Sequence, residues 1–117
     1  MQIFDNTNGP FVEVYATPST AKGGKGLYAT TDALDGTLTK YYLSTTFDVD
    51  TAYTLKVTIL NGVLNFYYNG SLVATESGVN RDALYFKAGD YCQSWQTIDS
   101  LSDYCETEIT AIAFSHI

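Results

Sequence analysis

Two Asn-Gly dipeptides constrain the fold of this chain more than any other feature of its sequence. Asn61-Gly62 follows the alternating segment Tyr53–Leu60, and Asn69-Gly70 follows Val63–Tyr68. Asn-Gly favours a two-residue type I′ hairpin turn, because both central residues of that turn need a positive φ. The alternation of apolar and polar residues in Tyr53–Leu60 is typical of a half-buried strand. We therefore expect an antiparallel meander of three strands that ends with Leu72–Thr75.

Within the first strand of this meander, the side chains expected to face inward are Tyr53, Leu55, Val57 and Ile59. An earlier run, Phe11–Ala16, also divides into two faces, with Val12, Val14 and Ala16 on one and Phe11, Glu13 and Tyr15 on the other. Both runs have the two-residue period of a strand whose faces meet different surroundings.

Short runs of this kind recur along the whole chain, and no helical period persists in it. Further runs are Leu27–Thr30, Leu38–Leu43 and Ile109–Ile117. Together they give about eight strands, which predicts an all-β fold with two packed antiparallel sheets, a β-sandwich or jelly roll. We found no linker or internal repeat, so residues 1–117 are expected to form a single domain.

The charge of the chain limits its partners. Six Lys and Arg residues stand against 13 Asp and Glu residues, which gives a net charge of −7. Without a basic stripe to neutralise phosphates, nucleic acid is not an expected partner. No apolar run approaches the roughly 20 residues that span a bilayer, so no membrane partner is expected. Two cysteines and one histidine are too few for a metal site, and we expect neither a metal nor a cofactor.

The two cysteines, Cys92 and Cys105, bracket a polar loop. A disulfide that closes this loop is the favoured interpretation, with a stabilisation of roughly 3 kcal/mol from loop closure. The glycosylation sequon Asn69-Gly70-Ser71 is typical of the same oxidising compartment. We therefore expect a secreted, extracellular protein.

The run Tyr85–Gln93 carries the strongest functional signal. Read as a strand, it turns Phe86 and Ala88 towards a core, and it turns Tyr85, Lys87, Gly89, Tyr91 and Gln93 to the opposite face. A cation, two phenols and an amide around a glycine are typical of the floor of a groove for an anionic ligand. Lys40 is the other cation suited to such a groove.

This run resembles the C-terminal signature of the alginate lyases of polysaccharide lyase family 7, which reads Tyr-Phe-Lys-Ala-Gly-x-Tyr-x-Gln. The resemblance implies a jelly roll that cleaves a 4-linked uronan such as alginate by β-elimination. A base removes the C5 proton beside the carboxylate, and an acid protonates the leaving O4. It assigns the catalytic acid and base to Tyr91, and contacts with the anionic polysaccharide to Lys87, Gln93 and Tyr85.

A second block of the family reads Gln-Ile-His, and this chain opens with Met1-Gln2-Ile3-Phe4. The resemblance assigns to Gln2 the neutralisation of the substrate carboxylate, and Phe4 stands where the histidine is expected. The family's Arg-x-Glu-x-Arg block has no counterpart, since Arg81 is the only arginine and is expected in a loop. The resemblance thus covers nearly all of this chain, but only the C-terminal half of the family domain.

Because of these two departures from the family pattern, three interpretations of the function stay open. The chain is either an active lyase, a catalytically incomplete uronan-binding module, or a half-domain that self-associates through exposed sheet edges. Taken alone, Tyr85 and Tyr91 also fit cross-strand packing. Trp95 either stacks on sugar rings or caps the edge of the sandwich, and His116 is expected to be a structural or exposed histidine.

Overall fold

The computed structural model describes residues 1–17, 26–47, 51–81, 83–89 and 108–113. Contacts between residues divide the chain into two units, Met1–Lys87 and Ala88–Ile117. All the described strands lie in the first unit. None of the described residues forms a helix that is long and apolar enough to cross a membrane.

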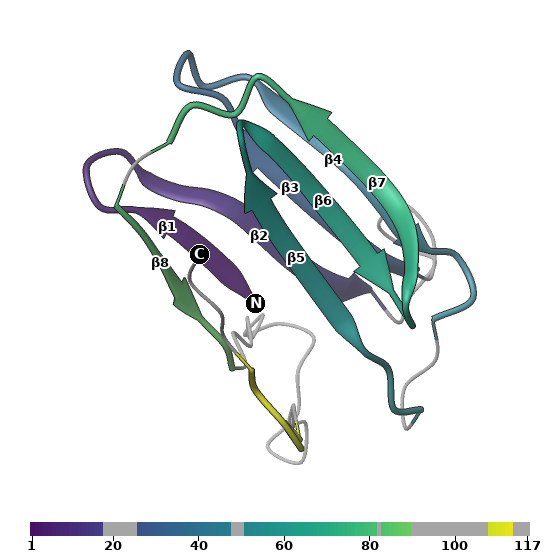
Figure 1. Ribbon diagram of the computed structural model, residues 1–117. Helices are drawn as coiled ribbons and strands as arrows, with labels where there is room; N and C mark the ends of the chain where they lie inside the picture. The colour runs from purple at the N-terminus through teal and green to yellow at the C-terminus, as the bar shows by residue number, and fades with distance from the viewer. Residues whose placement is uncertain (18–25, 48–50, 82, 90–107, 114–117) are drawn as a thin grey trace, which may run out of the picture. The chain divides into compact units, whose positions relative to one another are not determined.

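The first unit contains eight strands in two antiparallel sheets, which confirms the predicted all-β class and is consistent with a β-sandwich (Figure 1). The large sheet has the order β4-β3-β2-β1-β8, and the small sheet has the order β5-β6-β7. The strands are β1 (Gln2–Asp5), β2 (Gly9–Thr17), β3 (Gly26–Asp32), β4 (Leu38–Ser44), β5 (Leu55–Leu60), β6 (Val63–Tyr68), β7 (Ser71–Ser77) and β8 (Leu84–Lys87).

The small sheet is the predicted meander. Asn61 and Gly62 have φ values of 49° and 74°, and Asn69 and Gly70 have 48° and 83°. Both turns therefore have the two positive φ values that the Asn-Gly pairs predict. The start of the first strand was predicted too early, because β5 begins at Leu55. Tyr53 precedes the strand and is 41% exposed.

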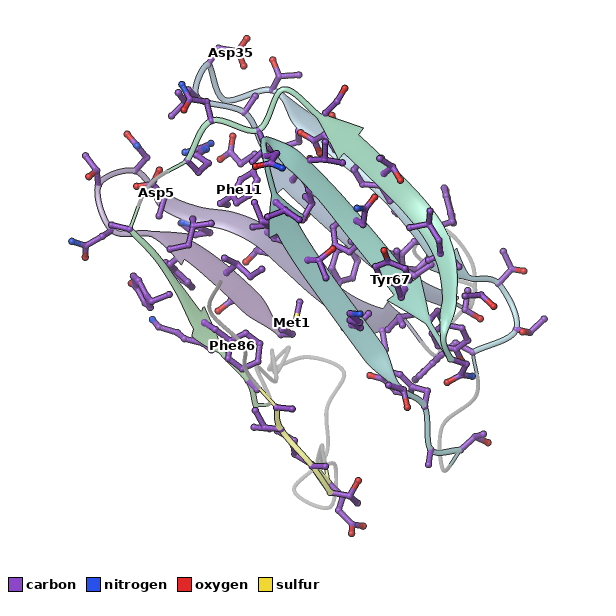
Figure 2. The ribbon with its side chains drawn as sticks, in the orientation of Figure 1. Met1, Asp5, Phe11, Asp35, Tyr67 and Phe86 are labelled. Atoms are coloured by element: carbon purple, nitrogen blue, oxygen red, sulfur yellow. The ribbon has the colours of Figure 1, made fainter. Side chains whose placement is uncertain are left out.

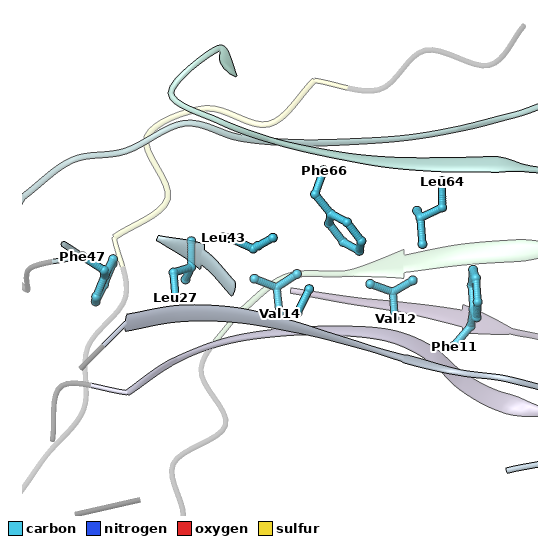
Figure 3. Packing of buried hydrophobic residues seen from close by; sticks show 9 residues of the cluster. Phe11, Val12, Val14, Leu27, Leu43, Phe47, Leu64 and Phe66 are labelled. Atoms are coloured by element: carbon cyan, nitrogen blue, oxygen red, sulfur yellow. The ribbon is translucent and has the colours of Figure 1, made fainter. Parts of the chain in front are cut away.

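The core lies between the two sheets, and Figure 3 shows its buried side chains meeting from both layers. Val12 and Val14 of β2 face it as predicted, whereas Ala16 is exposed. Phe11 was expected on the opposite face but is also buried. The cause is a β-bulge: Ile3 pairs with Val12 and the next pair is Phe4 with Pro10, so that Phe11 has no partner on β1. A bulge breaks the alternation and turns two successive side chains to one side.

A carboxylate links the two sheets inside the sandwich. The hydroxyl groups of Thr31 on β3 and Tyr41 on β4 both donate hydrogen bonds to Oε2 of Glu76 on β7, at 2.6 and 2.9 Å. Burial, together with this carboxylate, raises the pKa of the Tyr41 phenol. The phenol therefore stays protonated and keeps donating across the interface between the sheets.

Arg81 lies between β7 and β8, outside any strand, as predicted. Its Nη1 donates to Oδ2 of Asp5 at 3.1 Å, and both side chains are 5% exposed. Its Nη2 donates to the carbonyl oxygen of Asp32, and the guanidinium carbon lies 4.9 Å from the centroid of the Phe11 ring. Figure 2 shows Asp5 at the end of β1, near Phe11. Arg81 thus fixes the chain after β7 to the ends of β1 and β3.

Asp5 has further partners in the turn that follows it. The side chain of Asn8 and the backbone amide of Thr7 donate to its carboxylate, at 3.0 and 2.8 Å. These hydrogen bonds, with that of Arg81, lower the pKa of Asp5 to about 2. Hydrogen bonds to the charged form of a carboxyl group favour ionisation.

Two strand predictions in the C-terminal part need correction. The expected strand Tyr85–Gln93 ends at Lys87, and Ala88, expected in the core, is exposed. Gly89 has a φ of 151°, which favours glycine and interrupts an extended run. The described residues of the expected strand Ile109–Ile117, namely 109–113, form no strand and are exposed. Alternation of apolar and polar residues therefore did not predict the conformation of residues 109–113 correctly.

Candidate active site

One side chain from each strand of the large sheet contributes to a line across its face, which we call the cross-strand row. The register pairs Lys87 of β8 with Gln2 of β1, Gln2 with Glu13 of β2, Glu13 with Thr30 of β3, and Thr30 with Lys40 of β4. Residues directly opposite each other in paired strands share a face of the sheet. Neighbouring strands are about 4.8 Å apart, so the row crosses the sheet at right angles to its strands.

The cross-strand row lies on the face of the large sheet that is turned away from the small sheet. The chain neighbours of its members alternate with it: Val12 and Ala29 are completely buried in the core, and Ile3 packs against that core. Lys87 and Lys40 were predicted as cations of a groove, and Gln2 was predicted to neutralise the substrate carboxylate. The structure brings all three onto this outer face.

At one end of the row, Lys87 lies over two aromatic rings. The rings of Phe4 and Tyr85, which pair across β1 and β8, are stacked with their centroids 5.3 Å apart. The Lys87 Nζ lies 4.1 Å from the centroid of Phe4 and 5.6 Å from that of Tyr85. We call these three residues the Lys87 cluster. Tyr85 is 43% exposed, so it packs against Phe4 and still reaches the outer face.

At the other end, Lys40 lies over three tyrosines. Its Nζ is 4.0 Å from the ring centroid of Tyr28, 5.4 Å from that of Tyr42 and 5.9 Å from that of Tyr15. Tyr28 stacks on Tyr15 and meets Tyr42 edge-on. We call these four residues the Lys40 cluster. Its tyrosines were not predicted as site residues, although each holds an outward position in its strand.

A glycine makes room for this cluster. A Cβ added to Gly26 would lie 2.7 Å from the carbonyl oxygen of Ser44 and 3.3 Å from the Tyr28 ring. Contacts that short force a shift of the backbone, so β3 and β4 approach each other here because residue 26 has no side chain. The Tyr28 ring occupies this space and is only 1% exposed.

In the middle of the row, Gln2 and Glu13 are joined by a hydrogen bond. The Nε2 of Gln2 donates to Oε1 of Glu13 at 2.6 Å. An ionised carboxylate only accepts hydrogen bonds, so the nitrogen of the Gln2 amide faces β2. Glu13 was expected on the outward face but not as a site residue. Its cross-strand register with Gln2 could not be read from the sequence.

Two described tyrosines have a shifted pKa, and both shifts are upward. Burial is the main cause for Tyr41 and for Tyr53. An upward shift is the opposite of what a phenolate base requires. Tyr91 and Gln93, the predicted acid/base and second amide, lie outside the described residues, as do Cys92 and Cys105. Their roles and the disulfide stay predictions.

Two hollows, of about 170 and 140 Å³, lie at one end of the sandwich. Asp32, Ala33, Leu34 and Arg81 line both of them, and neither is lined by Gln2, Lys40, Tyr85 or Lys87, the predicted site residues that the structure describes. In the part of the chain that the structure describes, no three His, Cys, Asp or Glu side chains gather as a metal site would require. The cross-strand row therefore remains the best candidate site.

Comparison with known proteins gives a match to a family. A family model described as alginate lyase matches residues 1–116. The match includes β1 with Gln2 and Phe4, and β8 with Tyr85 and Lys87. No curated protein and no solved structure matches the chain.

Proposed function

Because this chain belongs to the alginate lyase family, we propose that it depolymerises a 4-linked uronan such as alginate by β-elimination. One observation carries the proposal. Gln2 and Lys87 come from two separate family blocks, and they are direct cross-strand partners on the outer face of the large sheet. An amide and an ammonium group side by side are suited to binding one carboxylate.

The chemistry needs these groups. The C5 proton of a uronate is weakly acidic while the neighbouring carboxylate is charged, and removing it forms an enolate-like intermediate. Preorganised donors and cations that neutralise this charge usually contribute most to such a reaction. The second N–H of Gln2 and the Nζ of Lys87 supply a hydrogen bond and a positive charge from adjacent strands.

Phe4 stands where the family has a histidine, so the positive charge beside the substrate carboxylate must come from another residue. A phenyl ring cannot take the proton-transfer or hydrogen-bonding role of the histidine expected at this position. It attracts a cation to its face instead, and the Lys87 Nζ lies 4.1 Å from its centroid. We infer that Lys87 supplies, above Phe4, the positive charge that the family's histidine would supply.

Tyr91 is our candidate for the proton transfer. An unperturbed phenol has a pKa of about 10, so its neutral form suits protonation of the leaving O4. To serve both steps, Tyr91 must start as a phenolate, which a nearby positive charge favours, take the C5 proton, and as the neutral phenol pass that proton to O4. One residue can do this when the two groups lie on the same side of the sugar, as in a mannuronate. This route depends less on a histidine than the anti route needed for a guluronate.

The absorbance of the unsaturated uronate product at short ultraviolet wavelengths tests the proposal. The substrates are alginate, mannuronan, guluronan and glucuronan. We expect Tyr91→Phe to lower the rate at least about 100-fold, because proton transfer by a positioned group contributes that much or more. Tyr67→Phe is the matched control, since it removes a hydroxyl from β6 of the small sheet, outside the candidate site, and it should keep most of the rate. Full product formation by Tyr91→Phe would refute the assignment.

A second candidate function is uronan binding without cleavage. Phe4 favours it, because a stacked phenyl ring stands where the family block has a proton-exchanging side chain. This candidate predicts that the protein retains uronans but forms no unsaturated product from any of the four. The activity assay therefore separates it from the lyase.

The other expectations from the sequence remain proposals. The sequon and the two cysteines support an extracellular protein, where polymeric uronans are accessible. Self-association is supported by the edge strands of the described sheets, β4 and β8 in the large one and β5 and β7 in the small one. The mass of the protein in solution tests it, and a monomer would refute it.

A further inference from the structure

The cross-strand row has an ordered pattern of charge. Lys87 and Lys40 stand at its two ends, the neutral side chains of Gln2 and Thr30 come next, and Glu13 occupies the centre. Glu13 is therefore two strand spacings, or roughly 10 Å, from the strand of each lysine. A surface evolved only to attract a polyanion has no evident need for a carboxylate at this place.

Among the residues that the structure describes, no cation is paired with the carboxylate of Glu13. Its hydrogen-bond partner among the described residues is the neutral amide of Gln2. The ammonium groups of Lys87 and Lys40 rest over the aromatic rings of their own clusters. No ion pair of the described residues includes Glu13, in contrast to buried Asp5, which is paired with Arg81. Glu13 thus presents an exposed negative charge beside the amide that is assigned to the substrate carboxylate.

A glycan laid along the row meets these charges one after another. A pyranose unit is about as long as the spacing between strands, about 4.8 Å, so successive sugars lie over successive strands. A carboxylate over β8 or β1 meets Lys87 and Gln2, and one over β4 meets Lys40. A carboxylate on the sugar over β2 meets Glu13, which carries the same charge.

We propose that Glu13 is a specificity-determining residue, which selects against a free carboxylate on the sugar bound over β2. This inference rests on the proposed function, since it concerns the choice among uronans. The preferred substrate class is a uronan whose charged units are interrupted, at the position over β2, by a sugar with an esterified carboxyl group or without one. A fully charged uronan still binds, but against the repulsion from Glu13.

The test is the affinity of oligouronates for the full chain, measured by calorimetry in a Tyr91→Phe background that prevents turnover. Glu13→Gln removes the charge and keeps an oxygen that accepts from Gln2. At low salt we expect it to tighten binding of a fully charged oligomannuronate about fivefold, the effect of two like charges about 4 Å apart in water. Binding of the methyl-esterified oligomer should not change. Salt should reduce the gain, because the groups are exposed.

Asp35→Asn is the matched control, because it changes the net charge equally in the exposed turn between β3 and β4, which holds no residue of the row; Figure 2 labels Asp35 in this turn. The inference is overturned if Glu13→Gln leaves the affinity for the charged oligomer unchanged. It is equally overturned if the gain is the same for the esterified oligomer, or if Asp35→Asn produces it. If these results occur while the unmodified chain still forms unsaturated product through Tyr91, the proposed function stands. Absence of both product and binding rejects the proposed function and the inference together.

Discussion

In the described part of the first unit, four cations lie over aromatic rings, namely Arg81, Lys87, Lys40 and Lys56, and the surroundings of the first three differ. Arg81 lies over Phe11, is almost completely buried, and has both the Asp5 carboxylate and a backbone carbonyl as acceptors. Lys87 and Lys40 lie over rings on the outer face, and no ion pair of the described residues includes either. The ring contact is common to all three. The presence of an acceptor separates the cation that holds the fold from those that are available to an anion.

The two lysines differ in turn by their distance from Gln2. Lys87 is its direct cross-strand partner, whereas Lys40 is three strands away, or about 14 Å. A substrate carboxylate bound at Gln2 is therefore attracted strongly by the ammonium group of Lys87 and only weakly by that of Lys40. We expect Lys87 to affect turnover and Lys40 to affect affinity alone.

The largest effect should come from Arg81→Ala. It leaves Asp5 buried without its cation and the carbonyl of Asp32 without its donor, and a broken buried pair is strongly destabilising. We expect the melting temperature, measured by calorimetry, to fall by roughly 10 °C or more. Lys56→Ala is the control, because Lys56 lies over the ring of Tyr67 on an exposed strand position. Equal losses from the two variants would contradict the distinction between a paired and an unpaired cation.

Lys87→Ala should have the next largest effect, and on activity rather than on folding. We expect kcat/KM for mannuronan to fall about tenfold, the value of one hydrogen bond to a charged group. Its melting temperature should stay close to that of the unmodified protein. Lys56→Ala again serves as control, since it removes the same charge from the small sheet. If kcat/KM fell only together with the melting temperature, the role of Lys87 would be structural.

Lys40→Ala should have a smaller effect of a different kind. We expect KM to rise about fivefold at low salt, the size of one exposed charge pair, with kcat unchanged. Steady-state kinetics on long oligomannuronates measures the two constants separately. Oligomers too short to reach from β1 to β4 should show no effect of the substitution. A fall in kcat with the short oligomers would place Lys40 near the reacting sugar and break the comparison.

The smallest effect concerns acid stability. The pKa of Asp5 is lowered to about 2 in the folded protein, from 3.8. Because this pKa is lowered by folding, the ionised carboxylate of Asp5 stabilises the folded protein fully above about pH 4, and this stabilisation is lost as the pH falls towards 2. We expect the melting temperature to drop by a few degrees over this interval, beyond the change shown by Asp5→Asn, which has no group to titrate there. Parallel curves for the two proteins would show that this carboxylate does not control acid stability.

Local sequence signals predicted much of this fold. The features that they missed depend on which residues pair across neighbouring strands. The Asn-Gly turns predicted the small sheet because turn type depends on two adjacent residues. The ion pair between Asp5 and Arg81 joins residues 76 positions apart, and no local pattern indicates it. The bulge at Phe11 was missed for a similar reason, since it depends on how β1 pairs with β2.

In the candidate site, too, the residues with a local sequence signal were predicted and those that depend on strand pairing were not. Lys87 and Gln2 were found because each lies in a short family block, and Lys40 because it is one of few cations. The tyrosines around Lys40 and the carboxylate beside Gln2 were not found, because their significance depends on which strands are neighbours. Tyr91 rests on the motif alone.

The bulge in β2 also bears on how this protein tolerates changes of length. Phe11 has no partner on β1, so deleting it would restore a regular ladder between Ile3 and Pro10 while leaving Gln2 opposite Glu13. A deletion beyond Glu13 has no bulge to absorb it, so it would instead shift the rest of β2 by one residue against β3 and turn those side chains to the opposite face of the sheet. Insertions and deletions in related chains should therefore gather on the Pro10 side of the bulge and be excluded from the Glu13 side.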